Sequence, residues 1–328
     1  MELELKLMKA IVHVLDTSIS MPMLSDRMLR LGQEEADYLA GHIQKVYTSD
    51  ECKNCTFLPE SELQAMLLDQ MDFVQFSQKL ARMIFDVMLI APDIPCADLL
   101  VLWCTINGRD ALAVLKMNYK TAYSHYYEQI EGENCNSLVK QRTLLPGTSS
   151  RADEAFIVDL TDGSIKLLEK RYPVDGVRDY YLSSRILQST QATPEKAKFK
   201  AVQEAVTQAV TACYQETPLV EAQVAEMLRE EAADGEVTVQ RVRQRVEEDF
   251  PLAAPTFSEQ LEQIDLPEEE PVTVSPSRVK RLETQSIKTV CGIEIKIPTS
   301  LPGGSEDYLE FINAPDGTIS MLIKGVLL

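Results

Sequence analysis

The stretch DLLVLWCTINGRDALAVLKMNYK, residues Asp98–Lys120, decides the fold of the N-terminal half of the chain. Leu99–Ile106 is strongly apolar, and a second apolar run occupies Ala111–Tyr119. Between them lies Asn107-Gly108, a dipeptide that two-residue hairpin turns favour. The pattern predicts a β-hairpin.

Further strands and two helices are expected on either side of this hairpin. Met1–Asp16 has the pattern of a strand that becomes apolar on both faces, as in a central strand. Helical spacing of apolar residues predicts helices over Gln33–Tyr47 and Asp72–Ile90. Strands are also expected over Ser137–Leu145 and Glu154–Leu168, the latter folded at Thr161-Asp162-Gly163. Together these elements predict an antiparallel or mixed sheet with flanking helices, over residues 1–175.

The second half has a different composition. Residues 176–260 have the apolar spacing of a helical region, with a long helix beginning near Pro194 and another that Thr238 caps. Residues 261–277 are acidic and contain prolines, which is typical of a linker. Residues 278–328 predict a small C-terminal β-unit, built from GIEIKIP and a hairpin at Asp316-Gly317. The fold class is therefore α+β.

The formal net charge of −19 argues against a protein that coats DNA with its whole surface. Such proteins are basic, because neutralising phosphates and releasing counterions supplies most of their affinity. The acidity is concentrated between Leu219 and Val272, where four Lys or Arg stand against fifteen Asp or Glu. Any contact with DNA must come from a local basic face.

Cysteine usage and hydropathy indicate the compartment. The seven cysteines are scattered, several within apolar runs, which suits reduced and buried thiols better than a disulfide framework. No run approaches eighteen apolar residues, and the N-terminal stretch lacks the pattern of a signal peptide. We expect a soluble cytoplasmic protein.

Two short motifs point weakly to chemistry. Cys52 and Cys55 form a CxxC, but zinc sites need four ligands and no second pair accompanies it, so a structural or incidental pair in a loop is expected. Glu294 and Lys296 form the ExK half of a nuclease metal site, which also needs an aspartate on a nearby strand. No metal or cofactor is predicted, and the motifs of common enzyme classes are absent.

Three basic groups are candidates for DNA contact. In the first, a helix–turn–helix reading of residues 220–249 would place Arg241 and Arg245 on a groove-facing helix surface. The alternative is a packed helical hairpin whose arginines pair with Glu230, Glu248 and Asp249. The other two groups could neutralise phosphates or be ordinary solvated surface. They are Lys196, Lys198 and Lys200 at the start of the long helix, and Arg278, Lys280 and Arg281 before the C-terminal unit.

Three segments resemble the bacterial 37-kDa nucleoid-associated protein family. They are DFVQFSQKLARMIFDVM (72–88) followed by the Asp98–Lys120 hairpin, DYYLSSRIL (179–187), and the C-terminal pattern with YLEFINAPDGTISMLIKG (308–325). The resemblance implies association with the bacterial nucleoid and DNA binding, without a known enzymatic activity or defined active-site residues.

The resulting prediction is a non-enzymatic protein of the cytoplasm and nucleoid that contacts the backbone of double-stranded DNA through a local basic face. The alternative is an acidic interaction module or DNA mimic. Its surface would bind a DNA-handling enzyme such as a topoisomerase in place of DNA. A nuclease using Glu294 and Lys296 is a third hypothesis.

Overall fold

The computed structural model describes residues 3–69, 71–214, 218–262, 264, 266–288, 292–299, 309–313 and 319–324. Contacts group the chain into two compact units, Met1–Pro194 and Glu195–Leu328. The first unit therefore includes residues 176–194, which the sequence pattern assigned to the helical region.

The first unit is built on a six-stranded sheet in which every pair of neighbours is antiparallel. The sequence predicted an antiparallel or a mixed sheet, and the sheet is antiparallel. The expected turn at Asn107-Gly108 joins two of its strands, and both residues have the positive φ angles, 51° and 78°, that a type I′ turn requires. The strand order is β1 (Leu5–Leu15), β3 (Ala97–Ile106), β4 (Arg109–Asn118), β7 (Glu154–Asp159), β8 (Ser164–Leu168) and β2 (Lys53–Thr56).

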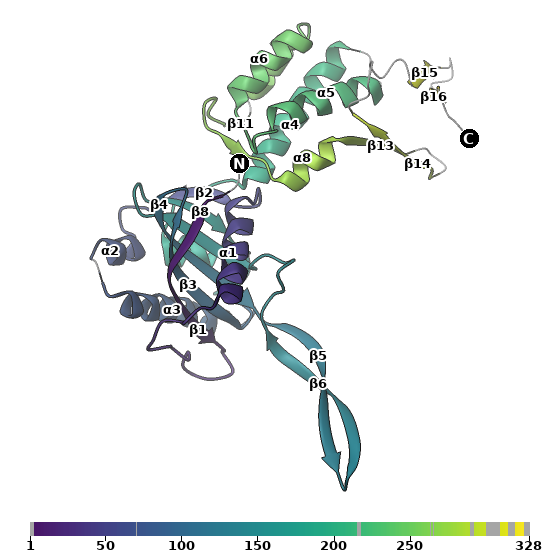
Figure 1. Cartoon of the computed structure of the whole chain (residues 1–328). Coiled ribbons are helices and arrows are strands. Elements are labelled where there is room, and N and C mark those ends of the chain that lie inside the picture. The colour runs from purple at the N-terminus through teal and green to yellow at the C-terminus, as the bar shows by residue number, and fades with distance from the viewer. Residues whose placement is uncertain are drawn as a thin grey trace. The chain divides into compact units, whose positions relative to one another are not determined.

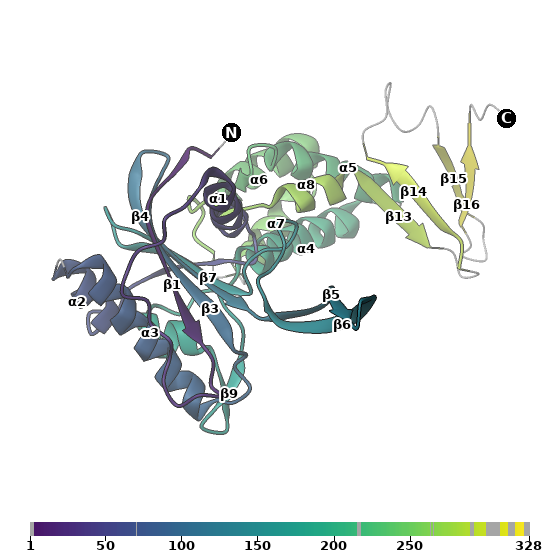
Figure 2. The same cartoon turned by 60° about the horizontal axis from the view of Figure 1, so that its bottom comes forward.

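Helices cover both faces of the sheet, as expected. Helix α1 (Gln33–Tyr47) packs on one face, and α2 (Glu62–Leu68) and α3 (Phe73–Ile90) pack on the other (Figures 1 and 2). Side chains of a strand alternate between faces, so Leu99 and Leu100 of β3 belong to different clusters, under α3 and α1 respectively. The Asp72 carboxylate caps α3 by accepting hydrogen bonds from two backbone N–H groups of its first turn.

The strand expected over Ser137–Leu145 exists, but it does not join the sheet. Strand β6 (Glu133–Leu144) pairs with β5 (Lys120–Ile130) in a separate two-stranded hairpin, here called the arm. Every residue of both strands is exposed, and the arm extends away from the sheet (Figure 1). The run over Ser137–Leu145 is strand-like in sequence, which is why the prediction placed it in the sheet.

The CxxC lies partly on a strand and not in a loop, which corrects the prediction. Cys52 precedes β2, and Cys55 lies within it. The two thiols are three residues apart, so they face opposite sides of the sheet, and each is buried in a different cluster. The pair is therefore incidental, as expected.

The first unit ends with short elements that pack around a buried tyrosine. Strands β9 (Tyr172–Val174) and β10 (Val177–Asp179) form a small hairpin, followed by the π-helix η1 (Leu182–Leu187). The residues after 176 therefore begin with a strand, where a helical region was expected. Tyr181, just before the π-helix, has no exposed surface.

A charged network is buried beside Tyr181. Lys116 Nζ of β4 lies 3.0 Å from Glu154 Oε2 of β7, and both side chains are almost fully buried. The hydroxyls of Tyr172 and Tyr181 donate to the same carboxylate oxygen at 3.3 and 3.4 Å. Burial lowers the pKa of Lys116, and the attraction of Glu154 opposes that effect.

The second unit contains the expected helices around one apolar core. The Thr238 hydroxyl caps α6 by accepting from the backbone N–H of Arg241 at 3.2 Å, as predicted. The helices are α4 (Glu195–Cys213), α5 (Pro218–Glu231), α6 (Val239–Asp249), α7 (Ala254–Leu261) and α8 (Pro276–Leu282). Valine, leucine and phenylalanine side chains of all five helices fill the core.

The segment expected to be a linker takes part in this packing. Within it, β12 (Val272–Thr273) pairs with β11 (Glu236–Val237), and Val272 and Val274 are buried in the core of the helices. Two further hairpins follow α8: β13 (Thr284–Lys288) with β14 (Glu294–Pro298), and β15 (Leu309–Asn313) with β16 (Ile319–Ile323). The β-unit expected over residues 278–328 thus begins within the helix α8, its described strands start at Thr284, and its expected turn at Asp316-Gly317 lies outside the described residues.

Candidate nucleic-acid interface

The lysines at the start of α4 do not form a uniform basic face. Lys198 lies 3.0 Å from both Glu195 and Glu270, and its side chain is largely buried. Burial lowers the pKa of Lys198, but hydrogen bonds to Glu270 and Glu195 outweigh burial and hold the pKa above its ordinary value. Lys196 and Lys200 are exposed, and Lys200 pairs with Glu204 one turn further along. Lys198 is thus a charge that the protein itself neutralises.

The two arginines of α6 are held by carboxylates. Arg241 Nε lies 3.0 Å from Glu231, at the end of α5. Arg245 lies 2.9 Å from Glu230 and 3.1 Å from Asp249. These are the ion pairs of the packed helical hairpin, with Glu231 taking part in addition to the expected Glu230 and Asp249.

Helix α8 presents its basic residues differently. Leu282 is buried in the core of the unit and Val279 packs against it, which fixes the orientation of this short helix. Lys280 and Arg281 consequently face solvent, and no ion pair of theirs is found in the described part of the chain. Arg278 is partly buried and makes a contact of its own.

The start of α4 and the start of α8 are connected through β12. Glu195 Oε2 accepts a hydrogen bond from the backbone N–H of Thr273 at 2.9 Å, and α8 begins at Pro276. The first turn of α4 and the basic helix therefore belong to one locally fixed assembly. Of the basic residues predicted to contact DNA, Lys280 and Arg281 are the ones that this assembly leaves exposed without a described ion pair.

The residues proposed for metal chemistry are not assembled into a metal site in the described residues. Glu294 and Lys296 are both exposed on β14, and Glu294 accepts a hydrogen bond from the Ser286 hydroxyl at 2.9 Å. No group of three His, Cys, Asp or Glu side chains that could hold a metal ion occurs within the described ranges. The nuclease hypothesis has no geometric support here.

The cysteines provide a test of how the first unit is packed. Burial raises the pKa of both the Cys52 and the Cys104 thiol to about 12, so both are protonated at neutral pH and shielded from reagents. Iodoacetamide at pH 8 should alkylate the exposed Cys135 and Cys213 and leave Cys52 and Cys104 unmodified, as mapped by peptide mass spectrometry. Alkylation of Cys52 at the rate of Cys135 would contradict the described packing.

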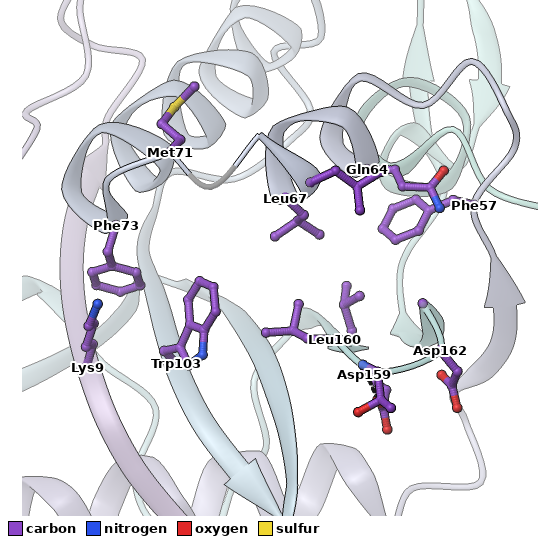
Figure 3. A pocket seen from close by; sticks show the side chains of 14 residues that line it. Lys9, Phe57, Gln64, Leu67, Met71, Phe73, Trp103, Asp159, Leu160 and Asp162 are labelled. Carbon is purple, nitrogen blue, oxygen red and sulfur yellow. Dashed lines mark hydrogen bonds between the residues drawn. The ribbon is translucent and has the colours of Figure 1, made fainter.

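One cavity of the first unit was not anticipated from the sequence. It has a volume of about 510 Å³ and lies between α2, the start of α3 and the sheet (Figure 3). Lys9 and Trp103 are partners on neighbouring strands, and the Lys9 ammonium lies 5.6 Å from the centre of the Phe73 ring and 5.9 Å from that of Trp103. The feature of the sequence that could have indicated this cavity is its single tryptophan, Trp103, on a predicted strand.

The far end of this cavity carries acidic residues that are already engaged. Arg109 lies 2.9 Å from Asp159 and 2.5 Å from Asp162. Hydrogen bonds from Ser164 and from Arg109 lower the pKa of Asp162 to about 2, so it is ionised throughout the physiological range. The cavity is thus an apolar space with fixed charges at its ends, which favours binding over acid–base catalysis.

Within the described ranges, no helix has both the length and the apolar character needed to cross a bilayer.

Comparison with curated proteins finds no significant match. The family model of the nucleoid-associated protein YejK, in contrast, matches residues 11–327, nearly the full chain. On that match, which includes the sheet, the helical core and the C-terminal hairpins, the chain belongs to the nucleoid-associated protein YejK family.

Proposed function

We propose that this protein binds double-stranded DNA through the phosphate backbone, without catalysing a reaction on it, and that α8 provides the contact. The family supports a role at the nucleoid. The observation that carries the proposal is the exposure of Lys280 and Arg281 on a helix anchored by the buried Leu282. Arg241, Arg245 and Lys198 contribute less, because carboxylates within the unit already neutralise them.

Binding of this kind is confined to a small part of the protein surface and does not depend on the DNA sequence. Contacts to phosphate oxygens position a protein on DNA without reading bases, and cations that displace counterions supply the affinity. The net charge of −19 repels DNA from most of the surface, so a few cations on α8 must act at short range. The expected complex is therefore weak and sensitive to salt.

Charge reversal on α8 tests the proposal. Lys280→Glu/Arg281→Glu should weaken binding to a labelled 20-base-pair duplex about 10- to 100-fold at 50 mM salt. The reason is that each lost phosphate contact removes roughly 0.9 from the slope of log affinity against log salt concentration. Fluorescence anisotropy measures the affinity.

A matched variant controls for total charge. Arg27→Glu/Arg30→Glu makes the same change in net charge at exposed positions of the first unit. It should reduce affinity no more than about threefold, through long-range repulsion alone. Equal losses in the two double variants would contradict a local site on α8.

A second candidate function is an acidic interaction module that binds a DNA-handling enzyme such as a topoisomerase. The ion pairs of the acidic segment favour it: Arg229, Arg243 and Arg245 are each bound to carboxylates of the unit. Glu247 and Glu248 of α6 remain exposed. Under this function the α8 variant would retain its binding to the enzyme, whereas Glu247→Lys/Glu248→Lys would lose it.

A further inference from the structure

The arm, β5 with β6, lacks the packing that normally stabilises a β-hairpin. Each of its residues is exposed, and an isolated two-stranded hairpin is marginally stable in water. Large apolar and aromatic side chains are nevertheless placed on it. Tyr123 is 68% exposed, Tyr127 53% and Leu138 78%. Such a concentration of exposed apolar surface marks an interaction site.

The pairing register sorts the arm's side chains into two faces. Tyr123 pairs with Lys140, and His125 pairs with Leu138. Cross-strand partners point to the same side, and so do residues two apart along a strand. One side, here called the aromatic face, therefore carries these four residues together with Tyr127, Gln129, Asn134 and Asn136.

The carboxylates of the arm lie elsewhere. Glu128 and Glu133 occupy the opposite face, together with Tyr126, and Glu131 lies in the turn at the tip. The aromatic face thus has a cation, aromatic rings and amides without a carboxylate. A binding partner of this face is expected to be anionic and to offer flat surfaces.

More positive charge lies near the base of the arm. The register shifts between Lys120 and Ala122, and Arg142 lies in the irregular part of the partner strand, two residues from Lys140. Such bulges redirect side chains locally. Lys120 itself is bound to Asp153 at 3.2 Å, so Lys140 and Arg142 are the arm's cations that remain for a ligand.

We propose that the aromatic face of the arm binds single-stranded nucleic acid, with bases stacked on Tyr123 and Tyr127 and phosphates held by Lys140 and Arg142. Alternate residues of a strand are roughly 6.6–6.8 Å apart, so the two tyrosines form successive platforms along one line with His125 between them. Proteins that bind single strands combine such stacking platforms with a basic track.

The chemistry favours a single strand over a duplex. A duplex hides the faces of its bases within the stack, whereas exposed rings gain most from bases that are free to stack on them. Glu128 and Glu133 repel phosphates from the opposite face, so the strand is confined to one side. The arm lies in the first unit and its binding does not depend on α8. The proposal of single-strand binding and the proposal of duplex binding can therefore fail separately.

The test is fluorescence anisotropy of labelled oligo(dT) and oligo(U), each about 20 nucleotides long, with the full-length protein. Tyr123→Ala and Tyr127→Ala should each weaken binding about tenfold, the lower part of the range for loss of a stacked base. Tyr123→Phe keeps the ring and should bind like the wild type. Tyr126→Ala removes a tyrosine that is 55% exposed on the opposite face and should also bind like the wild type.

Each result has a distinct meaning. Tighter binding of oligo(U) than of oligo(dT), or the reverse, identifies RNA or DNA as the preferred strand, and loss on Tyr123→Ala supports the proposal with either probe. Failure of the wild type to bind both oligonucleotides at 50 mM salt would overturn it. So would an equal loss in Tyr126→Ala, or a dimer detected by light scattering that Tyr123→Ala dissociates, because the face would then join two copies of the chain. The Lys280→Glu/Arg281→Glu variant should retain single-strand binding, which separates this site from the proposed duplex site.

Discussion

Replacing Glu154 by alanine is expected to lower the free energy of unfolding by about 3–5 kcal/mol, the largest effect of any substitution proposed for this chain. The reason is the buried Lys116 ammonium, which lies 3.0 Å from the Glu154 carboxylate. Without that carboxylate, Lys116 keeps the Asn118 side chain and the Pro95 carbonyl as hydrogen-bond partners but has no adjacent buried anion. Tyr172 and Tyr181 lose their acceptor at the same time. Urea denaturation followed by circular dichroism measures the loss.

Two further variants separate the buried charge from other causes. Lys79→Ala breaks an exposed ion pair with Glu62 in the same unit and should cost no more than about 1 kcal/mol. Lys116→Met/Glu154→Gln removes both charges while leaving an amide to accept from the tyrosines, and it should recover at least about half of the loss. A cost below about 1 kcal/mol for Glu154→Ala would show that this pair is not buried as described.

Acidification should destabilise the first unit through His13. Its Nδ1 accepts a hydrogen bond from the backbone N–H of Ser25 at 3.1 Å, so the ring proton is on Nε2, 3.0 Å from the Ser77 hydroxyl. Burial lowers the pKa of His13 from 6.5 to about 4, because a charged ring would be desolvated. A second ring proton would also break the bond to Ser25.

The sign of this effect follows from the two pKa values. Between pH 6.5 and 4 the unfolded chain binds a proton at His13 and the folded chain does not, so stability is fully present above pH 6.5 and is lost as the pH falls toward 4. Between pH 7 and pH 5 the wild type should lose about 2 kcal/mol from this group. His13→Asn keeps an acceptor for Ser25 without titrating, so its loss over the same range should be smaller by that amount. Identical losses in urea titrations of the two proteins would rule out His13 as the cause.

Local signals predicted the turns of the first unit, but β1 lies at an edge of the sheet where a central strand was expected. The turns at Asn107-Gly108 and at Thr161-Asp162-Gly163 depend on a few adjacent residues, and each forms where the sequence indicated. The arm was placed wrongly, because the adjacent Leu138 and Val139 give β6 the apolar character of a strand that packs on a sheet. Whether such a strand finds a partner layer is decided by distant residues, which periodicity does not encode.

The candidate site was predictable as a set of residues but not as a surface. Arg241 and Arg245 occur at helical spacing on α6, yet their charges are matched by Glu230 and Glu231 of another helix. Lys198 is matched by Glu270, far away in the sequence. Pairing across such separations depends on how the helices pack. Exposure of Lys280 and Arg281 follows in the same way from the burial of Leu282, which becomes apparent only with the fold.

The measurement that tests direct backbone binding most directly is a titration of labelled duplex DNA with the wild-type protein across a salt series. The account predicts that log affinity falls linearly with log salt, with a slope of roughly −2 from the exposed Lys280 and Arg281 at about 0.9 each. The slope should become shallower by about 2 in Lys280→Glu/Arg281→Glu. Absence of binding at 20–50 mM salt, or an affinity that does not change with salt, would contradict it and leave the acidic surface as the functional one.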